Sequence, residues 1–337
     1  MNKDKISIII PFKNEAKYLQ SCIESIQNQK NDEFEIEVIL VDDHSTDSSS
    51  EIASVFSRQF VHFNYLKNKG DGVVDALQFG LEKSTGNYIH RMDADDLMAE
   101  DKLKNLYQLF AVYPNLNIAT GKVKYFREDQ VLGEGFIKYE EWLNQLIDDS
   151  LFYQDIYKEC TVASANWLMS KNDLLSIGGF GVSYPEDYDL VFRAYQAKFI
   201  VRGCSEVTHL WRDHSLRASR TVIHYKDNNF FKLKLRWFLK LDYDPSGELF
   251  VYGAGKKGKT IAKMLSEKEI PFRWFTNNNN KIGQNIYGVI LENDTTIFDV
   301  KQAQILVLIS NPKENEEVLF RLEHNSLIQG QDFFIFN

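Results

Sequence analysis

The first hundred residues alternate short apolar runs with segments whose apolar residues recur at helical spacing. Ile6 to Pro11 and Glu35 to Val41 are typical of buried strands, and Lys17 to Gln29 between them has the period of a helix. The same order repeats as a strand over 61–66, a helix over 73–83 and a strand over 87–92. Strands that alternate with helices predict a mostly parallel sheet, covered by helices on both faces.

Beyond residue 100 the pattern is less regular. Helices are predicted over 101–113, 139–157 and 171–177, and the stretch from Phe126 to Ala165 has no pattern that we can convert to chemistry. The aromatic and basic segment from Tyr225 to Leu241 has helical spacing. This amphipathic helix either packs between domains or touches anionic lipid. We favour packing, because a single short helix binds membranes weakly.

A second unit follows, with predicted strands over 249–252, 272–275 and 305–309 and a helix over 253–265. A length of 337 residues also agrees with two domains of roughly 150 residues each. We therefore predict an α/β protein in three parts, namely a domain over 1–224, a connecting helix over 225–245 and a smaller Rossmann-like domain over 246–337.

Composition narrows the function classes. A formal net charge of -9 argues against a protein that binds nucleic-acid backbones, which favours a basic surface. The three cysteines are odd in number and far apart, so we expect neither a disulfide framework nor a CxxC metal site. No apolar stretch approaches the roughly 20 residues that span a bilayer. We expect a cytoplasmic protein, either free or on the inner face of the cell membrane.

The strongest local signal is the run Asp93, Ala94, Asp95, Asp96, directly after a predicted strand. Carboxylates two residues apart on an extended chain leave it on the same side, so Asp93 and Asp95 can address a hard cation such as Mg²⁺ or Mn²⁺. The alternative is structural, since Asp96 could cap the following helix. Asp42 and Asp43 end another strand and are candidates for binding a nucleobase or ribose, whereas Asp47 is better explained as a helix cap.

Two further polar segments carry candidate chemistry. Glu186 and Asp187 open a helix, where acids commonly complement the helix dipole, but a carboxylate there could also remove a proton from an acceptor hydroxyl. Asp187 is the candidate base. Arg212 and His214 could neutralise charge on a departing diphosphate, and a solvated loop of mixed charge is the alternative.

Six ordered segments between residues 5 and 219 together resemble glycosyltransferase family 2 enzymes of GT-A fold. They are IIIPFKNE, VDDHSTD, NKGDGVVDALQFG, GNYIHRMDADD, GGFGVSYPEDYDLVFRA and WRDHSLRAS. The resemblance implies a GT-A nucleotide-diphospho-sugar transferase fold. One departure is Asp75, which stands where a small or amide residue often precedes the alanine.

The resemblance also implies a role for each matching residue. Asp187 would be the catalytic base, and Asp93 and Asp95 would hold Mn²⁺ or Mg²⁺, with His214 as a further candidate ligand. The residues that would contact the nucleotide-sugar donor are Pro11, Glu15, Asp42, Asp43, Lys69, Gly70, Arg91, Asp93, Arg212 and His214. The family reaction is a single displacement that inverts the anomeric carbon.

We therefore predict an inverting transferase that moves a sugar from a nucleoside diphosphate donor to a hydroxyl of a glycan or lipid-linked glycan. UDP is the first candidate for the nucleotide, and the reaction would serve polysaccharide or glycoconjugate synthesis. Two alternatives stay open. A nucleotidyltransferase would favour a glycine-rich basic loop after the first strand, which IIIPFKNE does not supply. A non-catalytic sugar-nucleotide-binding regulator would not need acids at all three sites, namely after the two strands and at the helix start.

The second domain carries Gly253, Gly255 and Gly258 in the GxGxxG spacing, between a predicted strand and a predicted helix. Such a loop can place a pyrophosphate at a helix N-terminus. Dinucleotide binding also calls for an acid after the next strand, where Thr276, Asn277 and Asn278 stand instead. The segment resembles small Rossmann-like domains appended to bacterial sugar-modifying enzymes. We expect a docking or regulatory module rather than an NAD(P) site.

Overall fold

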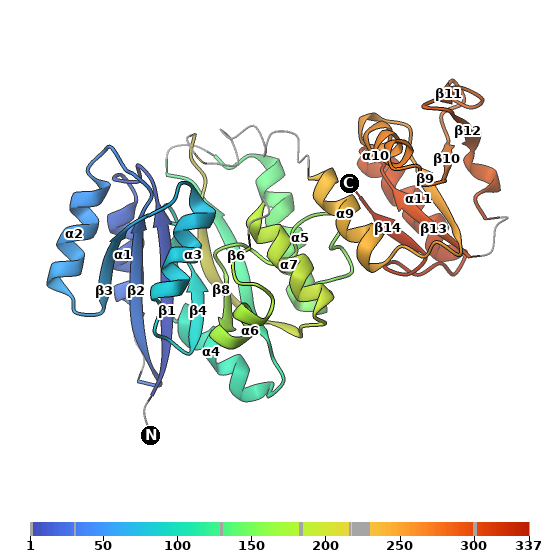
Figure 1. The fold of residues 1–337 in the computed structure, drawn as a ribbon. Helices are drawn as coiled ribbons and strands as arrows, with labels where there is room; N and C mark the ends of the chain where they lie inside the picture. The colour runs from blue at the N-terminus through green and yellow to red at the C-terminus, as the bar shows by residue number, and fades with distance from the viewer. Residues whose placement is uncertain are drawn as a thin grey trace. The chain divides into compact units, whose positions relative to one another are not determined.

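The structure is a computed structural model that describes residues 3–29, 32–128, 131–181, 185–215, 217, 230–298 and 302–336. The chain forms two compact units (Figure 1). The first comprises residues 1–152 and 161–221, and the second comprises residues 153–160 and 222–337. Residues 153–160 group with the second unit in the structure, whereas the prediction places them within the domain over 1–224.

The first unit is a single mixed sheet with helices on its faces (Figure 1). Its elements, in chain order, are β1 (Asp4–Phe12), α1 (Leu19–Gln27), β2 (Phe34–Asp42), α2 (Ser49–Gln59), β3 (Phe63–Lys67), α3 (Val73–Lys83), β4 (Tyr88–Arg91), β5 (Leu97–Met98), α4 (Lys102–Val112), β6 (Ile118–Phe126), α5 (Glu134–Asp149), β7 (Trp167–Ser170), α6 (Lys171–Ser176), α7 (Glu186–Gln196) and β8 (Val201–Arg212). The strand order is β3-β2-β1-β4-β7-β6-β8-β5.

The first four strands in that order form the predicted parallel sheet. Alternate residues of β1 point to opposite faces, so Ile6, Ile8 and Ile10 pack in a core with α1 and α4, while Ile9 faces α3. Helix α3 approaches the sheet closely at Gly80, where an added Cβ would lie 2.4 Å from Cγ2 of Ile9. Because β1, β2 and β4 run parallel, their carboxyl ends lie at one edge of the sheet.

The other half of the sheet was not predicted. β7 runs antiparallel to both β4 and β6, β8 runs parallel to β6, and β5 runs antiparallel to β8. Strand β8 therefore ends at the same edge as β4, and its last residue, Arg212, lies opposite Phe126. The predicted helix over 139–157 is also corrected: α5 begins at Glu134 and ends before Ser150, whose φ of 56° is left-handed.

The second unit contains a smaller sheet of six strands in the order β11-β12-β10-β9-β13-β14. Five of the strands run parallel, and β11 runs antiparallel to β12. Its elements are α9 (Phe231–Leu241), β9 (Glu248–Tyr252), α10 (Lys256–Glu267), β10 (Arg273–Thr276), β11 (Asn285–Ile286), β12 (Val289–Asn293), the 3₁₀ helix η1 (Asp294–Thr296), β13 (Ala303–Val307), α11 (Pro312–His324) and β14 (Phe333–Ile335).

The amphipathic helix predicted over 225–241 is α9, and residues 225–229 lie outside the described part of the chain. Its apolar face packs within the second unit. The ring of Phe238 lies 5.6 Å from that of Tyr157 and 5.0 Å from that of Phe334, and Nζ of Lys234 donates to the carbonyl of Lys158 at 2.6 Å. Residues 153–160 are thus part of the core that α9 covers.

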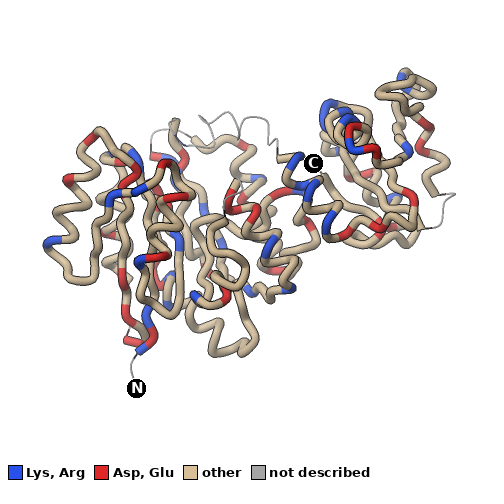
Figure 2. Tube along the Cα trace, in the orientation of Figure 1, with Lys and Arg blue, Asp and Glu red and all other residues tan. Residues whose placement is uncertain are grey.

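Charged residues of both signs are interspersed along the two units rather than gathered in one stretch (Figure 2). Of the helices in the described ranges, none combines the length and the apolar character needed to cross a membrane. Cys22, Cys160 and Cys204 all carry free thiols.

Candidate functional site

The predicted site residues of the first unit gather at the carboxyl ends of β1, β2 and β4. Asp42 ends β2 opposite Phe12, and Pro11 lies opposite Val41. The amide of Asp43 donates to the carbonyl of Phe12 at 2.8 Å, which continues the ladder by one bond past the strand. The edge of a parallel sheet therefore presents these side chains together, as the sequence predicts.

Asp42 and Asp43 are buried and held by several donors. Oδ1 of Asp42 accepts from the amide of Ser45 at 2.8 Å, and Oδ2 accepts from the hydroxyls of Ser50 and Tyr65 at 2.6 and 3.0 Å. Burial raises the pKa of Asp42, but these hydrogen bonds outweigh it and leave the pKa below its ordinary value. Asp42 is therefore an ionised acceptor, and its three donors hold its carboxylate in a fixed orientation.

Asp43 organises the loop after β3. Its Oδ1 accepts from Nδ2 of Asn68 at 2.8 Å and from the amide of Gly72 at 2.9 Å. Lys69 is exposed and lies over the ring of Phe79 at 5.0 Å. At Gly70 an added Cβ would clash with the carboxylate of Asp75, which accepts from the amide of Asp71 at 2.9 Å. The unusual Asp75 thus stabilises this loop.

The acidic turn after β4 meets the end of β8. Nε2 of His214 lies 2.9 Å from Oδ2 of Asp95, and Nε of Arg212 donates to the carbonyl of Asp95 at 2.7 Å. The guanidinium of Arg212 also lies over the rings of Tyr18 and Phe126 and pairs with Glu128. More than 110 residues of sequence separate the two segments, which the structure brings into direct contact.

Asp96 does not cap a helix, which corrects the structural alternative considered for it. It is 1% exposed, its Oδ1 accepts from the amide of Arg212 at 2.8 Å, and its Oδ2 lies 3.0 Å from Nε2 of His209. The N-cap of α4 is Asp101 instead, five residues further on. Asp47 is not a helix N-cap either, because the N-cap of α2 is Ser48, but its Oδ1 accepts from the amide of Ser49, the first residue of α2, at 3.0 Å.

Carboxylates converge on Glu15 from several segments. Its pKa is raised to about 8 by burial and by the charges of Asp95, Asp47 and Asp93. This crowding of negative charge favours a cation at the acidic turn.

Arg91 links the acidic turn to the start of α7. Its Nε donates to Oδ1 of Asp93 at 3.0 Å, and its NH1 donates to Oε1 of Glu186 at 2.9 Å. Glu186 is 2% exposed, and its Oε2 is a buried oxygen without a hydrogen-bond partner in the described part of the chain. Burial and the charge of Glu186 raise the pKa of Asp187 to about 7, whereas Arg91 lowers it. Such a pKa suits a general base near neutral pH.

Arg193 fixes the glycine loop that precedes α7. Its Nε pairs with Asp189 at 2.9 Å, one helical turn back, and its NH1 donates to the carbonyls of Ile177 and Gly179. Gly179 and Gly181 have φ values of 62° and 63°, which glycine adopts without strain. Asp189 therefore has a structural role. Glu186 and Asp187 are the two acids at the start of α7 that could take part in catalysis.

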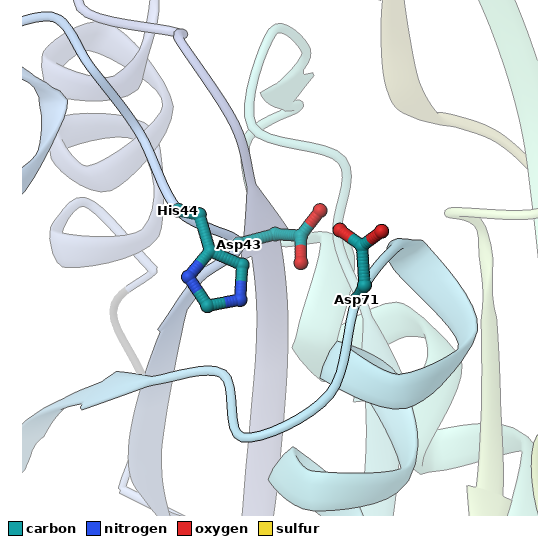
Figure 3. Close-up of side chains that lie close together, drawn as sticks. All are labelled: Asp43, His44 and Asp71. Carbon is teal, nitrogen blue, oxygen red and sulfur yellow. The ribbon is translucent and has the colours of Figure 1, made fainter.

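Two places in the first unit could hold a cation. Within the described ranges, one group of three residues brings its ligand atoms within 4.8 Å of one another, namely Asp43, His44 and Asp71. Figure 3 shows the carboxylates of Asp43 and Asp71 facing each other. Nζ of Lys13 lies 3.4 Å from Asp43 and 3.8 Å from Asp71, and Nε2 of His44 lies 2.8 Å from the carbonyl of Gly70. The ammonium group of Lys13 therefore already neutralises part of the charge of these carboxylates.

The second place is the acidic turn. Carboxylate and imidazole groups suit Mn²⁺, and Asp95 and His214 offer both. Nδ1 of His214 is buried without a hydrogen-bond partner among the described residues, so the ring is not locked by a second bond. Asp93 is half-buried beside them, with Arg91 on one oxygen and Oγ of Ser164 3.4 Å from the other. The donor types of Asp93, Asp95 and His214 suit a divalent ion, but among the described residues their ligand atoms do not all lie within 4.8 Å of one another, as those of the first group do.

Sequence reasoning missed Ser164, Glu128 and Arg217 as neighbours of the acidic turn. Arg217 lies over the rings of Trp211 and Tyr125, at 5.0 and 5.6 Å. Ser164 and Glu128 lie in or beside the stretch without a readable pattern, so only the pairing of β6 with β7 and β8 places them. The WRDHSLRAS segment contains Arg217, but its spacing alone does not show which of its basic residues reaches the acidic turn.

Two glycines of the loop after β9, Gly253 and Gly258, allow close backbone packing. A Cβ on Gly258 would lie 1.9 Å from the carbonyl oxygen of Gly253, and one on Gly253, whose φ is 120°, would lie 2.7 Å from that of Leu308. A Cβ on Gly255 would meet nothing within 4 Å. Nζ of Lys281 donates to the carbonyl of Ala254 at 2.7 Å. β10 ends at Thr276 and is followed by asparagines rather than by an acid.

The sequence profile of glycosyl transferase family 2 matches residues 7–175, half of the chain. The chain belongs to this family. It is 31% identical over 157 residues to the glycosyltransferase GlyA of Streptococcus pneumoniae, which covers 46% of this chain and 22% of GlyA. It is 28% identical over 151 residues to the poly(ribitol-phosphate) beta-N-acetylglucosaminyltransferase TarP of Staphylococcus aureus, covering 44% of this chain and 46% of TarP. The matches thus span less than half the length of these relatives.

The fold of a solved relative agrees with that of the chain. The crystal structure of S. aureus TarS 1-349 in complex with UDP-GlcNAc superposes with a TM-score of 0.55 at 16% identity, over 71% of this chain and 68% of TarS 1-349. This likeness confirms the predicted GT-A fold. It carries no residue roles, because the sequence identity is low.

Proposed function

We propose that the chain is a metal-dependent glycosyltransferase that moves a sugar from a nucleoside diphosphate donor to a hydroxyl group. UDP is the first candidate for the donor's nucleotide, and the transfer inverts the anomeric carbon. One observation carries the proposal. Three segments far apart in sequence meet at one edge of the sheet: the acidic turn after β4, the end of β8 and the start of α7. They offer a cation site, guanidinium groups and a carboxyl whose pKa is about 7.

The donor would lie across the ends of β1, β2 and β4. Pro11, Asp42 and Asp43 would line the nucleoside side, with Glu15 nearer the acidic turn, and Gly70 and the exposed Lys69 lie in the loop that Asp43 anchors. The ordered, ionised carboxylate of Asp42 can accept from a ribose or base with little reorganisation. Arg212 and His214 lie on the diphosphate side.

Asp93, Asp95 and His214 would hold Mn²⁺ or Mg²⁺. The bound ion supplies Lewis-acid stabilisation of the diphosphate leaving group. The protein's part is to fix the ligands, and the bonds from Arg91 to Asp93 and from Arg212 to Asp95 do this before any ligand binds.

Asp187 is the base of the proposed step. The acceptor hydroxyl gives its proton to the carboxylate of Asp187 while its oxygen forms a bond to the anomeric carbon. The bond from that carbon to the diphosphate oxygen breaks, and the electron pair leaves with the nucleoside diphosphate. The carboxylate must be ionised to act, which a pKa of about 7 permits at neutral pH.

The substrates come by analogy with the relatives. TarS was crystallised with UDP-GlcNAc, and the name of TarP specifies N-acetylglucosamine transfer to poly(ribitol phosphate). UDP-GlcNAc is therefore the first donor to test and a hydroxyl-rich surface polymer or lipid-linked glycan the first acceptor. A cytoplasmic site, free or at the membrane surface, fits this chemistry. We assign the second unit as a Rossmann-like docking or regulatory module without NAD(P).

The test compares catalysis with binding in Asp187→Asn. UDP release from UDP-GlcNAc with Mn²⁺ and a poly(ribitol phosphate) acceptor should fall by about 10³-fold, since a positioned base contributes roughly 10²–10⁴-fold. The Kd for UDP should stay within about threefold of the wild type. Asp101→Asn is the matched control, an exposed acid at a left-handed position that asparagine tolerates. Equal loss of UDP binding and turnover in Asp187→Asn would contradict the role as base.

A further inference from the structure

Two neighbouring helices of the second unit, α9 and α10, carry charges of almost one sign (Figure 2). α9 contains four Lys and Arg residues and no acid, and α10 contains four lysines and one acid, its last residue. The exposed residues of the two helices are Lys232, Arg236, Lys240, Lys256, Lys259, Lys263 and Glu267. Because the whole chain has a formal net charge of -9, cations gather here against the overall sign.

Each helix presents its exposed cations along one side. On α9 they follow one another at intervals of four residues, and on α10 at intervals of three and four, which keeps them on the same side of a helix. At 1.5 Å per residue the two rows are about 12 and about 10 Å long. Lys234 is fully buried and Lys257 is half-buried beside the charge of Glu159, so neither belongs to these rows. We call the six exposed cations the basic face: Lys232, Arg236, Lys240, Lys256, Lys259 and Lys263.

The two helices cover the same face of the second sheet. The register of β10, β9, β13 and β14 places four residues in one line across the sheet, namely Trp274, Val251, Leu306 and Phe334. Residues in such a line point to one face. On α9 the ring of Phe238 lies 5.0 Å from that of Phe334, and on α10 a Cβ added to Gly258 would lie 3.8 Å from Nε1 of Trp274. The helices also contact each other, so their two rows of cations lie side by side.

The opposite face of the sheet carries the opposite charge. Helix α11 covers that face, because its Val318 and Leu322 pack in one core with Phe250, whose side chain points away from that of Val251. The exposed residues of α11 include one lysine and three acids, namely Lys313, Glu316, Glu317 and Glu323. The second unit is therefore polarised across its sheet, and an anionic surface would attract the basic face and repel the face of α11.

The arrangement of the basic face favours a surface over a single charged polymer chain. Packed helices lie about 8–10 Å apart, so the two rows form a two-dimensional array. A linear polyanion can follow one row, whereas an anionic membrane surface meets both. Each Lys or Arg near such a surface strengthens binding by about fivefold, and six together by about 10⁴-fold, similar to the reversible binding that one myristoyl chain provides. No exposed residue of α9 or α10 is apolar, so the contact does not depend on insertion.

We propose that the basic face of α9 and α10 binds the anionic headgroups of a membrane, as a reversible peripheral contact of the second unit. The contact names the partner of the docking module assigned above. It stands without the transferase activity, and only its use rests on the proposed function: a chain held at the membrane would meet a lipid-linked acceptor more often.

The first measurement is sedimentation of the full chain with lipid vesicles. Vesicles of equal parts phosphatidylglycerol and phosphatidylcholine should bind the chain at about 0.1 M NaCl, and vesicles of phosphatidylcholine alone should not. Raising NaCl to about 1 M shortens the Debye length from about 10 to about 3 Å and should release the chain. A chain that binds neither vesicle, or both equally well, would overturn the proposal.

Variants then locate the contact. Removing three cations of either row should weaken binding to the anionic vesicles by about 100-fold, at fivefold for each cation. The α9 variant combines Lys232→Gln, Arg236→Gln and Lys240→Gln, and the α10 variant combines Lys256→Gln, Lys259→Gln and Lys263→Gln. A control with the same change of net charge replaces three exposed lysines elsewhere and should change binding less than about threefold. It combines Lys83→Gln, Lys198→Gln and Lys313→Gln.

The outcomes separate the membrane contact from its alternatives. Glutamine is a good helix former, so the thermal unfolding of each variant should match that of the wild type. Row variants that bind the vesicles like the wild type, or a control that loses as much as they do, would overturn the proposal. Binding to soluble poly(ribitol phosphate) without binding to vesicles would also overturn it, in favour of a soluble polyanion. UDP binding with Mn²⁺ is measured separately: its absence in the wild type would overturn the proposed function and leave the vesicle result standing.

Discussion

Both units place a recognisable motif at the carboxyl end of a parallel strand, yet the two motifs end in different surroundings. The acidic turn after β4 receives side chains from β8, from Arg91 and, through Arg91, from α7. The glycine loop after β9 receives one lysine, and two of its glycines are explained by close backbone packing. Convergence of distant polar groups, rather than the motif itself, therefore indicates a catalytic or binding site.

The largest effect on UDP binding is expected at the proposed cation site. Asp95→Asn should weaken UDP binding in the presence of Mn²⁺ by about 100-fold, because the substitution removes a charged ligand that His214 faces at 2.9 Å. Asp71→Asn is the matched control from the other acidic group and should change the Kd less than about twofold, since Lys13 already serves that group. The reverse order of effects would move the cation to Asp43, His44 and Asp71.

A second prediction concerns pH. Burial and the charge of Glu186 raise the pKa of Asp187 to about 7, and the base acts only when ionised. At saturating Mn²⁺, kcat/KM should therefore fall about tenfold for each pH unit below 7 and level off above it. The Kd for UDP should not follow this curve, because Asp187 is not a donor contact. A rate that stays constant from pH 5.5 to 8 would show that another group takes the proton.

The smallest effects on transfer are expected in the second unit. Gly258→Ala forces a Cβ to 1.9 Å from the carbonyl oxygen of Gly253 and should destabilise this unit by about 1–3 kcal/mol, measured by urea unfolding. Gly255→Ala places its Cβ in open space and should be nearly neutral for stability. Neither should change UDP binding more than about twofold. Loss of UDP release in Gly255→Ala without unfolding would give the glycine loop a direct role.

Local patterns were sufficient for the parallel half of the first sheet. The structure contains the strands predicted from Ile6 and Glu35 and the helix predicted from Val73. Because the strands run parallel, Asp42, Asp43 and Asp93 lie at one edge of the sheet. That edge is a consequence of chain order alone. The position of Asp42, Asp43 and Asp93 at this edge could therefore be predicted without long-range information, whereas Arg212 and His214 reach it only through the pairing of β8 with β6.

The remaining features depend on pairing between distant residues. Asp96 could be a helix cap by its position, but its partners are Arg212 and His209, more than 110 residues away. Helix α5 ends at Asp149, and Ser150 after it adopts the left-handed conformation although it is not a glycine. Tyr157 stacks on Phe336 at 5.1 Å, which places residues 153–160 in the second unit although neighbouring residues belong to the first. Propensity and period carry no information of this kind.

The comparison between the two units is tested most directly by calorimetric titration of the purified chain with UDP, GDP and NADH, each with and without Mn²⁺. We predict that UDP binds only with the metal, that Asp95→Asn weakens this binding by about 100-fold, and that NADH does not bind under either condition. NADH binding without metal, together with no response to UDP or GDP, would contradict the account and move the site to the loop of Gly253, Gly255 and Gly258.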